Sequence, residues 1–456
     1  MKPSSTFLPD PLPCGWVTDR IRDRLRRVVG GDWGADPGSA DELVDVVVVR
    51  VADMDGIGIA LDDPTIRAVT PWSLETRRLR PDSLVLEKSG GGEKQNVGRV
   101  ALVGHLDGEA ICSNFMAVMD VDGTTSSSFV NYAFSALYDT DMNFPSVKQT
   151  TGIQNLDVVA YLSTHIVFPV QDEQKRIAAY LDASCRAIDA AVAAKRGQIV
   201  VLAGTFKATL QRLVTRGLGR KPVFRETGSP WLSKVPRNWS LVMLKRLCDI
   251  QSGLTLGKEY EGSLVERPYL RVANVQDGHV LLDDLSTIEV PPEVAARTTL
   301  RAGDVLMTEG GDLDKLGRGV VWQGEVADCL HQNHVFAIRC RDWKLRPQFL
   351  AYVSAAQYGR DYFEATGKKT TNLAATNSTK VGQFPIPLPP VDEQDELIAY
   401  LDDESRKVSG LRSLLEQQID TLTAYRKSLI HECVTGQRRI TDEDVNRVTA
   451  HAATFA

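Results

Sequence analysis

Long apolar runs are missing from this chain of 456 residues. No stretch approaches the roughly 18 apolar residues that a membrane-spanning helix needs. The opening residues, MKPSSTFLPDPLP, also lack the basic and then apolar segments of a signal peptide. Seven cysteines are scattered without any C-x-x-C pair, which is typical of proteins in a reducing compartment. These absences predict a cytoplasmic protein that does not enter the membrane.

Signatures of catalysis are also scarce. The chain contains no G-x-S-x-G, no H-E-x-x-H and neither the N-P-P-Y nor the D-P-P-Y tetrapeptide of amino-methyltransferases. The glycine loop 253–259 is one residue shorter than a phosphate-binding loop and ends in glutamate where magnesium binding needs Ser or Thr. The spacing of Cys329, His331, His334 and Cys340 is unusual for zinc. We therefore expect no catalytic residue, no metal site and no cofactor in this chain.

An excess of positive charge is missing as well. The chain carries 53 Lys and Arg against 59 Asp and Glu, for a formal net charge of −6. This sum does not favour nucleic acid as a partner, but the distribution of charge matters more than the sum. From Lys195 to Arg246, twelve basic residues stand against one acidic residue, Glu226. That stretch is either a solvated helix end and linker or a basic surface that contacts phosphates.

What the sequence does contain is a repeat. Residues 172–182, DEQKRIAAYLD, return 220 positions later as DEQDELIAYLD at 392–402. The register continues without a gap until Val214-Thr215 matches Val434-Thr435. A period this long is not that of a solenoid, whose repeats span about 20–50 residues. It indicates two similar halves, each ending in the same long helix.

Both repeated segments have the pattern of a helix that begins after proline and carries acidic residues in its first turn. In the second helix, alternating steps of three and four residues predict a coiled-coil seam: Val408, Leu411, Leu415, Gln418, Leu422, Tyr425 and Leu429. We expect the two helices to pair antiparallel as a rod of roughly 65 Å, with Gln198 and Gln418 fixing the register. The alternative is that each helix packs only on its own domain.

The segments before the helices repeat more faintly. RVADM at 50–54 resembles RVANV at 271–275, and Gly98-Arg99 matches Gly317-Arg318. Both segments contain short β-branched runs broken by glycine loops. The predicted fold class is α/β, in the α+β sense, with two similar globular domains and two long antiparallel helices. The expected boundaries are 1–166 for the first domain, 167–222 for the first helix, 223–385 for the second domain, 386–440 for the second helix and 441–456 for a C-terminal tail.

Polar loops at matching places in both halves are candidates for DNA contacts. Glycine lets a backbone approach a ligand closely, while Lys and Arg bind phosphates and Gln, Asn and Thr reach base edges. The first half supplies Lys88, Ser89, Lys94, Arg99, Lys148, Gln149, Thr151 and Gln154. The second half supplies Lys315, Arg318, Lys368, Lys369, Thr370 and Asn372. The alternative for each loop is an ordinary solvated turn.

The order of these parts resembles a known family. Two helix starts, PVQDEQKRIAAYLD and PPVDEQDELIAYLD, occur together with PYLRVANVQDGHV and LRAGDVLMTEGG. Over about residues 10–440 this pattern is similar to the specificity subunit of type I restriction–modification systems. The first half departs from the second in RVADMDG, which lacks the asparagine of RVANVQDG.

The resemblance implies that each globular domain is a target recognition domain for one half of a bipartite double-stranded DNA site. It also implies that the helices set the spacing and dock two modification subunits, which are methyltransferases and carry S-adenosylmethionine. Restriction subunits, which are helicase-nucleases, would join them. By this resemblance the chain is a reader without catalysis of its own. The alternatives are a self-contained restriction or modification enzyme and a coiled-coil scaffold that binds no DNA.

Overall fold

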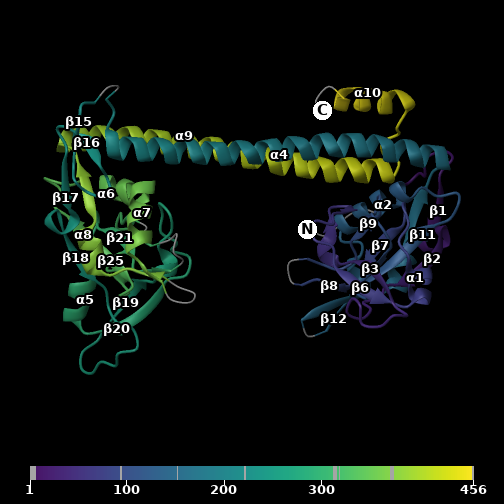
Figure 1. The fold of residues 1–456 in the computed structure, drawn as a ribbon, viewed down its shortest axis with the longest axis horizontal. Coiled ribbons are helices and arrows are strands. Elements are labelled where there is room, and N and C mark those ends of the chain that lie inside the picture. The colour runs from purple at the N-terminus through teal and green to yellow at the C-terminus, as the bar shows by residue number, and fades with distance from the viewer. Residues whose placement is uncertain are drawn as a thin grey trace. The chain divides into compact units, whose positions relative to one another are not determined.

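The structure, a computed structural model, describes residues 7–92, 95–150, 152–219, 222–311, 316–317, 319–369 and 374–453. By its internal contacts the chain divides into two compact units (Figure 1). Unit 1 contains Met1–Lys195 and Glu416–Ala456, and unit 2 contains Arg196–Leu415. The division falls inside both long helices, α4 (Gln171–Arg216) and α9 (Val391–Val434). Each unit therefore holds one globular domain and a part of each helix.

The domain of unit 1 is built from small sheets. Its four-stranded antiparallel sheet has the order β2 (Leu25–Gly30), β11 (Met116–Val121), β7 (Leu84–Glu87) and β9 (Val100–Leu102). A mixed sheet pairs β10 (Ala110–Cys112) in parallel with β3 (Val44–Val49), which pairs antiparallel with β6 (Ile66–Val69). The remaining strands are β12 (Val147–Thr150), β13 (Ile153–Leu156) and β8 (Ser89–Gly90) in one sheet, β1 (Val17–Arg20) with β14 (His165–Phe168), and β4 (Met54–Asp55) with β5 (Gly58–Ile59).

The domain of unit 2 repeats this topology. Its four-stranded sheet has the order β18 (Cys248–Ser252), β25 (Val335–Cys340), β21 (Val305–Thr308) and β23 (Gly319–Val321). Its mixed sheet has the order β20 (Ser286–Val290), β19 (Val265–Leu270) and β24 (Leu330–His331), with the last pair parallel. The other sheets contain β22 (Gly310–Gly311), β27 (Ala374–Ala375) and β26 (Lys368–Lys369), then β17 (Ser240–Met243) with β28 (Pro385–Leu388), and β15 (Phe224–Glu226) with β16 (Lys234–Pro236). The matching orders confirm the predicted α/β class and the internal repeat.

Helices occupy matching places in the two domains. Unit 1 has α1 (Pro71–Arg77), α2 (Ser127–Asp139) and α3 (Val158–Leu162). Unit 2 has α5 (Pro292–Thr298), α6 (Pro347–Ala355), α7 (Gln357–Thr366) and α8 (Ser378–Gln383). Within the segment predicted as a tail, α10 (Asp442–Ala453) is helical, and Asp442 forms an ion pair with Arg176 (2.8 Å). Across the described ranges, no helix has both the length and the apolar character needed to cross a bilayer.

Each domain packs its core against the start of one long helix. In unit 1 the core contains three phenylalanines and two aliphatic residues of α4: Phe129, Phe134, Phe168, Ile177 and Leu181. In unit 2 it contains three phenylalanines and two leucines of α9: Phe349, Phe363, Phe384, Leu397 and Leu401. Full burial of one such side chain stabilises a fold by about 1.5–3 kcal/mol. The start of each long helix is therefore part of its own domain.

The long helices also pair with each other, as predicted. In unit 1, Lys195 Nζ donates to Gln418 Oε1 (2.5 Å), and Arg426 lies 3.0 Å from Asp189. Residue numbers therefore rise along α4 as they fall along α9. In unit 2 the same antiparallel direction holds, because Phe206 and Ser405 line one pocket while Gly217 lies against Glu393. This pairing confirms the antiparallel coiled coil.

Three details of the predicted seam are wrong. Gln198 is exposed, and Lys195 takes its expected place beside Gln418. Leu411 and Tyr425 are exposed although the spacing places them in the seam. Arg426 faces α4 instead of Tyr425, because it pairs with an aspartate there. The apolar spacing thus predicts the pairing, but at Tyr425 the inner face of α9 is displaced by one residue, to Arg426.

Candidate nucleic-acid interface

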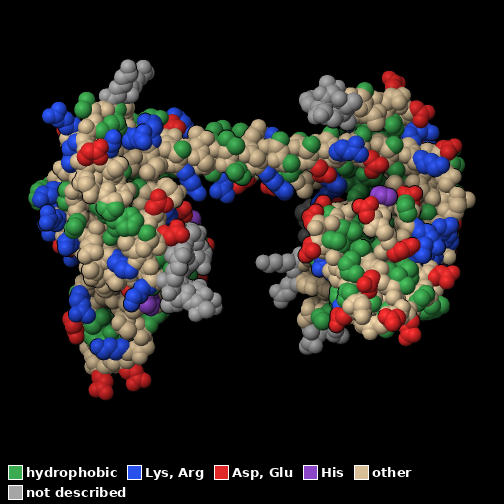
Figure 2. Space-filling view, viewed as in Figure 1, with side chains coloured by type: hydrophobic (Ala, Val, Ile, Leu, Met, Phe, Trp, Pro, Cys, Tyr) green, Lys and Arg blue, Asp and Glu red, His purple; other side chains and the backbone are tan. Residues whose placement is uncertain are grey.

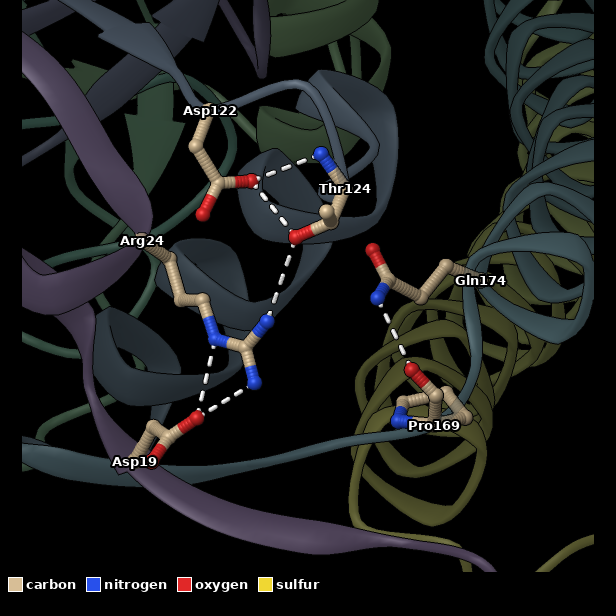
Figure 3. A network of polar contacts seen from close by, with 6 residues as sticks. All are labelled: Asp19, Arg24, Asp122, Thr124, Pro169 and Gln174. Carbon is tan, nitrogen blue, oxygen red and sulfur yellow. Dashed lines mark hydrogen bonds and ion pairs between the residues drawn. The ribbon is translucent and has the colours of Figure 1, made fainter.

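A buried glutamine fixes the first long helix to the domain of unit 1. Gln174 belongs to the repeated DEQ motif and sits in the first turns of α4. Its Nε2 donates to Pro169 O (2.9 Å), as Figure 3 shows, and its Oε1 accepts from Ser126 N (2.8 Å), the N-cap residue of α2. Gln174 therefore links the start of α4 to the turn that precedes it and to the first turn of α2.

The same clamp occurs in unit 2. Gln394 Oε1 accepts from Arg346 N (2.9 Å), the N-cap residue of α6. Its Nε2 donates to Pro389 O (3.0 Å) and to Lys344 O (2.9 Å). Gln174 and Gln394 are both buried. The glutamine that marks the sequence repeat is thus a structural residue, and it positions each domain on its own helix.

The turn beside the first clamp is held by charged side chains (Figure 3). Thr124 donates to Asp122 Oδ1 from both its N–H and its hydroxyl (2.8 Å each). Arg24 donates to Thr124 Oγ1 (3.3 Å) and, through Nε, to Asp19 Oδ2 (2.9 Å). Burial alone raises the pKa of Asp122, but hydrogen bonds from threonine side chains and backbone outweigh it and lower that pKa below 3.8. The carboxylate therefore stays ionised and rigidifies the entry to α2.

In unit 1 a glycine loop follows the central sheet, and Gln154 supports it from inside. Gln154 is only 4% exposed. Its Oε1 accepts from Val97 N (3.2 Å) and its Nε2 donates to Gly92 O (3.4 Å). At Gly91, where φ is +62°, an added Cβ would lie 2.8 Å from the Gln154 oxygen. Gln154, a predicted base contact, therefore uses its amide to shape the loop.

The other described candidates of unit 1 divide into supporting and exposed residues. Arg99 pairs with the buried carboxylate of Glu87 (2.9 Å), which gives it a structural partner. Ser89 is half-buried and donates to Asn155 Oδ1 (2.6 Å) across the pair β8–β13. Lys88 is half-buried, while Lys148 and Gln149 are exposed on β12. The exposed positions lie on the three-stranded sheet next to the glycine loop.

Lys148, like Arg99, forms an ion pair with a carboxylate of its own domain. Its Nζ lies 2.8 Å from Asp157 Oδ2. This hydrogen bond and a further one from Ala160 N lower the pKa of Asp157, the N-cap residue of α3. Because the side chain of Lys148 is 72% exposed and that of Asp157 is 30% exposed, solvent screens the pair and it contributes little stability. Lys148 can therefore exchange its carboxylate partner for a phosphate at small cost.

In unit 2 the matching sheet carries fewer described candidates. Lys368 is exposed on β26, where its backbone pairs with Ala375, and Lys369 follows it in the strand. Six candidates lie outside the described residues: Lys94, Thr151, Lys315, Arg318, Thr370 and Asn372. Apart from Lys88, which precedes β8, and Arg99, which precedes β9, the described candidates lie on equivalent three-stranded sheets, β8–β13–β12 and β22–β27–β26.

Sequence analysis missed a polar pair beside this sheet in unit 2. His334 Nδ1 lies 2.7 Å from Glu309 Oε2, and both side chains are partly exposed. Glu309 directly precedes β22, as Lys88 directly precedes β8. In the sequence, Asn114 corresponds to Asn333 at the same 219-residue offset that relates Gly98-Arg99 to Gly317-Arg318, so Phe115 corresponds to His334. His334 also belongs to the cysteine and histidine segment whose spacing is unusual for zinc, and the described residues contain no group of three or more His, Cys, Asp or Glu that could hold a metal ion.

The paired helices carry an exposed apolar face in unit 2. Val200 and Val201 on α4, and Leu411 and Leu414 on α9, are each about half exposed or more. Figure 2 shows hydrophobic side chains on the surface of the paired helices. Gly197 and Gly204 flank the valines at helical spacing, and a Cβ at either would meet open space. No described residue of this chain therefore packs against α4 at these two glycines.

Comparison with known proteins gives relatives of one kind, although no family model matches the chain. The chain is 25% identical over 371 residues to the type I restriction enzyme EcoKI specificity subunit of Escherichia coli K12, covering 76% of this chain and 75% of that protein. It is 23% identical over 206 residues to the putative type I restriction enzyme MjaX specificity subunit of Methanocaldococcus jannaschii. That match covers 45% of this chain and 47%, about half, of the relative.

Solved structures share the fold over nearly the whole chain. A chain from work on complex assembly and conformational transition of the type I R-M system superposes with a TM-score of 0.71 at 20% identity, covering 94% of this chain and 100% of that one. The HsdS subunit from Thermoanaerobacter tengcongensis gives a TM-score of 0.53 at 19% identity, covering 94% and 98%. Together with the curated relatives, this confirms the resemblance predicted from the repeated motif. The chain is a relative of type I restriction enzyme specificity subunits.

Proposed function

We propose that this chain is the DNA sequence-recognition subunit of a type I restriction–modification complex. The observation that carries the proposal is the repeated domain, in which the same topology and the same glutamine clamp occur twice. In this proposal the domain 1–166 reads one half-site of double-stranded DNA and the domain 223–385 reads the other. A bipartite target is the natural ligand of two similar readers in one chain.

The three-stranded sheet of each domain is the proposed reading surface. Lys148, Gln149 and Lys368 are exposed on it, and Lys88 lies at its edge. Their side chains can donate to phosphate oxygens and to acceptors on base edges. The six candidates outside the described residues remain part of the proposal. Arg99 and Gln154 support this surface from within, since both are occupied by internal partners.

The helices 167–222 and 386–440 are the proposed docking site for two modification subunits. The exposed face of Val200, Val201, Leu411 and Leu414 supports this assignment, because apolar faces of helices are normally covered by a partner. The methyltransferase subunits would bring S-adenosylmethionine, and restriction subunits would bring nuclease activity. In this proposal the chain itself is non-catalytic, works in the cytoplasm and contributes sequence recognition.

Insertion into a helix tests the division of roles. We expect four residues added after Leu202 to change the spacer length of the methylated sequence while both half-sites stay the same. The same four residues added in the exposed loop at Ser39 serve as the control and should leave the spacer unchanged. The measurement is methylome sequencing of cells that carry the complete complex. Altered half-sites after the helix insertion would show that the helices and domains do not have these roles.

Charge placed on the helical face tests the docking proposal. Val201→Glu combined with Leu414→Glu should weaken assembly with the modification subunit by roughly ten-fold or more, because a charge is buried without a partner. Ala203→Glu is the matched control, since Ala203 is exposed on α4 and lies roughly 160° around the helix from Val201. Assembly is measured by titration with the purified modification subunit. Equal affinity of the double variant and the control would refute docking on this face.

A further inference from the structure

One backbone position is held identically in the two domains. In unit 1, Lys88 N donates to Phe115 O (2.8 Å) and Lys88 O accepts from Leu156 N (2.7 Å). In unit 2, Glu309 N donates to His334 O (2.8 Å) and Glu309 O accepts from Thr376 N (2.7 Å). Both residues follow the end of a central strand, β7 or β21, and precede the glycine strand β8 or β22. The two positions are structurally equivalent.

The side chains on this shared frame carry opposite charge. Unit 1 presents Lys88 beside Phe115, a residue that is 50% exposed. Unit 2 presents Glu309 beside His334, with 26% and 53% of their side chains exposed. In the part of the chain that the structure describes, no carboxylate lies within ion-pair distance of Lys88. A positive and a negative side chain therefore extend from equivalent backbone positions, directly before β8 in unit 1 and β22 in unit 2.

Stability does not account for this exchange. The backbone is already fixed on both sides by hydrogen bonds that are independent of the side chain. A partly exposed ion pair such as Glu309–His334 contributes little, about 0–1 kcal/mol. The Lys88 side chain extends toward the end of β2, where a Cβ at Gly30 would lie 3.2 Å from its Nζ. The backbone hydrogen bonds at this position are the same in both domains, whereas the charged side chains differ.

The two charges suit different partners on DNA. Lysine donates to the acceptors of a base edge, above all guanine O6 and N7, and also to phosphates. Glutamate is repelled by phosphates, and it accepts from the exocyclic amino group of cytosine. A carboxylate at the edge of a DNA-binding surface is therefore unfavourable unless a base amino group faces it. Glu309 is therefore a stronger indication of contact with a base than a nearby basic residue, which can equally contact a phosphate.

We propose that Lys88 and Glu309 are equivalent specificity-determining residues, one for each half-site, with His334 orienting the Glu309 carboxylate. The inference rests on the proposed function and deepens it. Lys88 selects a base that presents acceptors in the major groove, and Glu309 selects a base that presents an amino group. The two half-sites then differ at the base pair that faces this position.

The test is selection of randomised duplexes by the complete complex, followed by sequencing of the bound DNA. Glu309→Gln should relax the preference at one base pair of one half-site by roughly ten- to a hundred-fold and leave the other half-site unchanged. Lys88→Met should do the same in the opposite half-site. Glu309→Lys should change which base is preferred at that pair. Glu289→Gln, on the exposed side of β20, is the matched control and should change nothing.

Several outcomes overturn the inference. If Lys88→Met weakens binding to all sequences equally and lowers the salt slope by about one, the lysine contacts a phosphate. If Glu309→Gln and Glu309→Lys leave both half-sites unchanged, the carboxylate does not read a base. Thermal unfolding of each variant identifies any that fail to fold, and Glu309→Gln preserves the shape of the side chain. A wild-type complex that selects no split sequence overturns the proposed function together with this inference.

Discussion

Replacing Gln394 by alanine removes the clamp of unit 2 with little other change. The glutamine is fully buried, and its amide makes three hydrogen bonds to the backbone of its domain. Alanine favours the helix and fills the same backbone position. The variant therefore isolates the effect of the amide. Gln174→Ala provides the same change in unit 1, where the amide makes two such hydrogen bonds.

The size of the effect follows from the number of bonds. A hydrogen bond contributes about 1 kcal/mol net, and a buried backbone group that loses its partner costs about 1–3 kcal/mol. Removal of Gln394 leaves the N–H of Arg346 and the carbonyls of Lys344 and Pro389 without this partner. We expect unit 2 to lose about 3–5 kcal/mol in Gln394→Ala. For Gln174→Ala we expect unit 1 to lose about 2–4 kcal/mol.

Hydrogen exchange read by mass spectrometry is the appropriate assay, because a chain with two units does not unfold in one transition. In Gln394→Ala, exchange should accelerate at the start of α6 and in the first turns of α9, and unit 1 should keep its protection. Gln417→Ala, exposed on α9, is the control and should stay within about 0.5 kcal/mol of wild type. If Gln394→Ala matches this control, the repeated glutamine is not a structural clamp.

Three further predictions concern stability. Asp304→Ala should destabilise unit 2 by about 2–3 kcal/mol, because Arg339 then loses the carboxylate that it contacts through two hydrogen bonds (2.8 and 2.7 Å). An unchanged midpoint of chemical denaturation would contradict this prediction. Burial lowers the pKa of His331 from 6.5, so the unfolded chain binds a proton at this residue more readily than folded unit 2 does. Unit 2 should therefore lose stability as the pH falls below about 6.5. His331→Gln should flatten the dependence of unfolding free energy on pH, measured by chemical denaturation. Gly217→Ala should lower the free energy of unfolding by about 1–3 kcal/mol, because φ at Gly217 is +73° and the added Cβ would lie 3.2 Å from Trp239. A thermal unfolding midpoint equal to that of wild type would show that alanine is not strained there.

The repeat and the long helices could be predicted because their signals are local in sequence. The DEQ motif, the preceding prolines and the apolar spacing lie within one segment each, so the sequence order carries them. The strand order could not be predicted, because β10 pairs with β3 across about 60 residues of chain. The exact seam was missed for a related reason. Spacing alone cannot show that Arg426 turns inward to pair with Asp189.

The candidate site was predicted only in part, because residue type does not reveal where a polar group finds its partner. Arg99 and Gln154 are the kinds of residue that bind DNA, yet Glu87 and the backbone of Val97 already occupy them. Glu309 was overlooked for the opposite reason, since a search for basic and amide groups passes over a carboxylate. Its proposed role rests on the backbone hydrogen bonds that make it equivalent to Lys88.

Comparison of the two halves distinguishes residues that stabilise the shared fold from residues that differ between the two domains at equivalent backbone positions. Where both domains use the same chemistry, as at Gln174 and Gln394, the side chain is buried and bonded to the backbone. Where the chemistry differs on an identical backbone, as at Lys88 and Glu309, the side chain is partly exposed beside the glycine strand. A recognition domain built in this way can change its target by substitution at the exposed positions, because the free energy that holds those positions in place comes from other residues. The Glu309→Lys exchange tests this separation directly, since it should alter the preferred base without lowering the stability of unit 2.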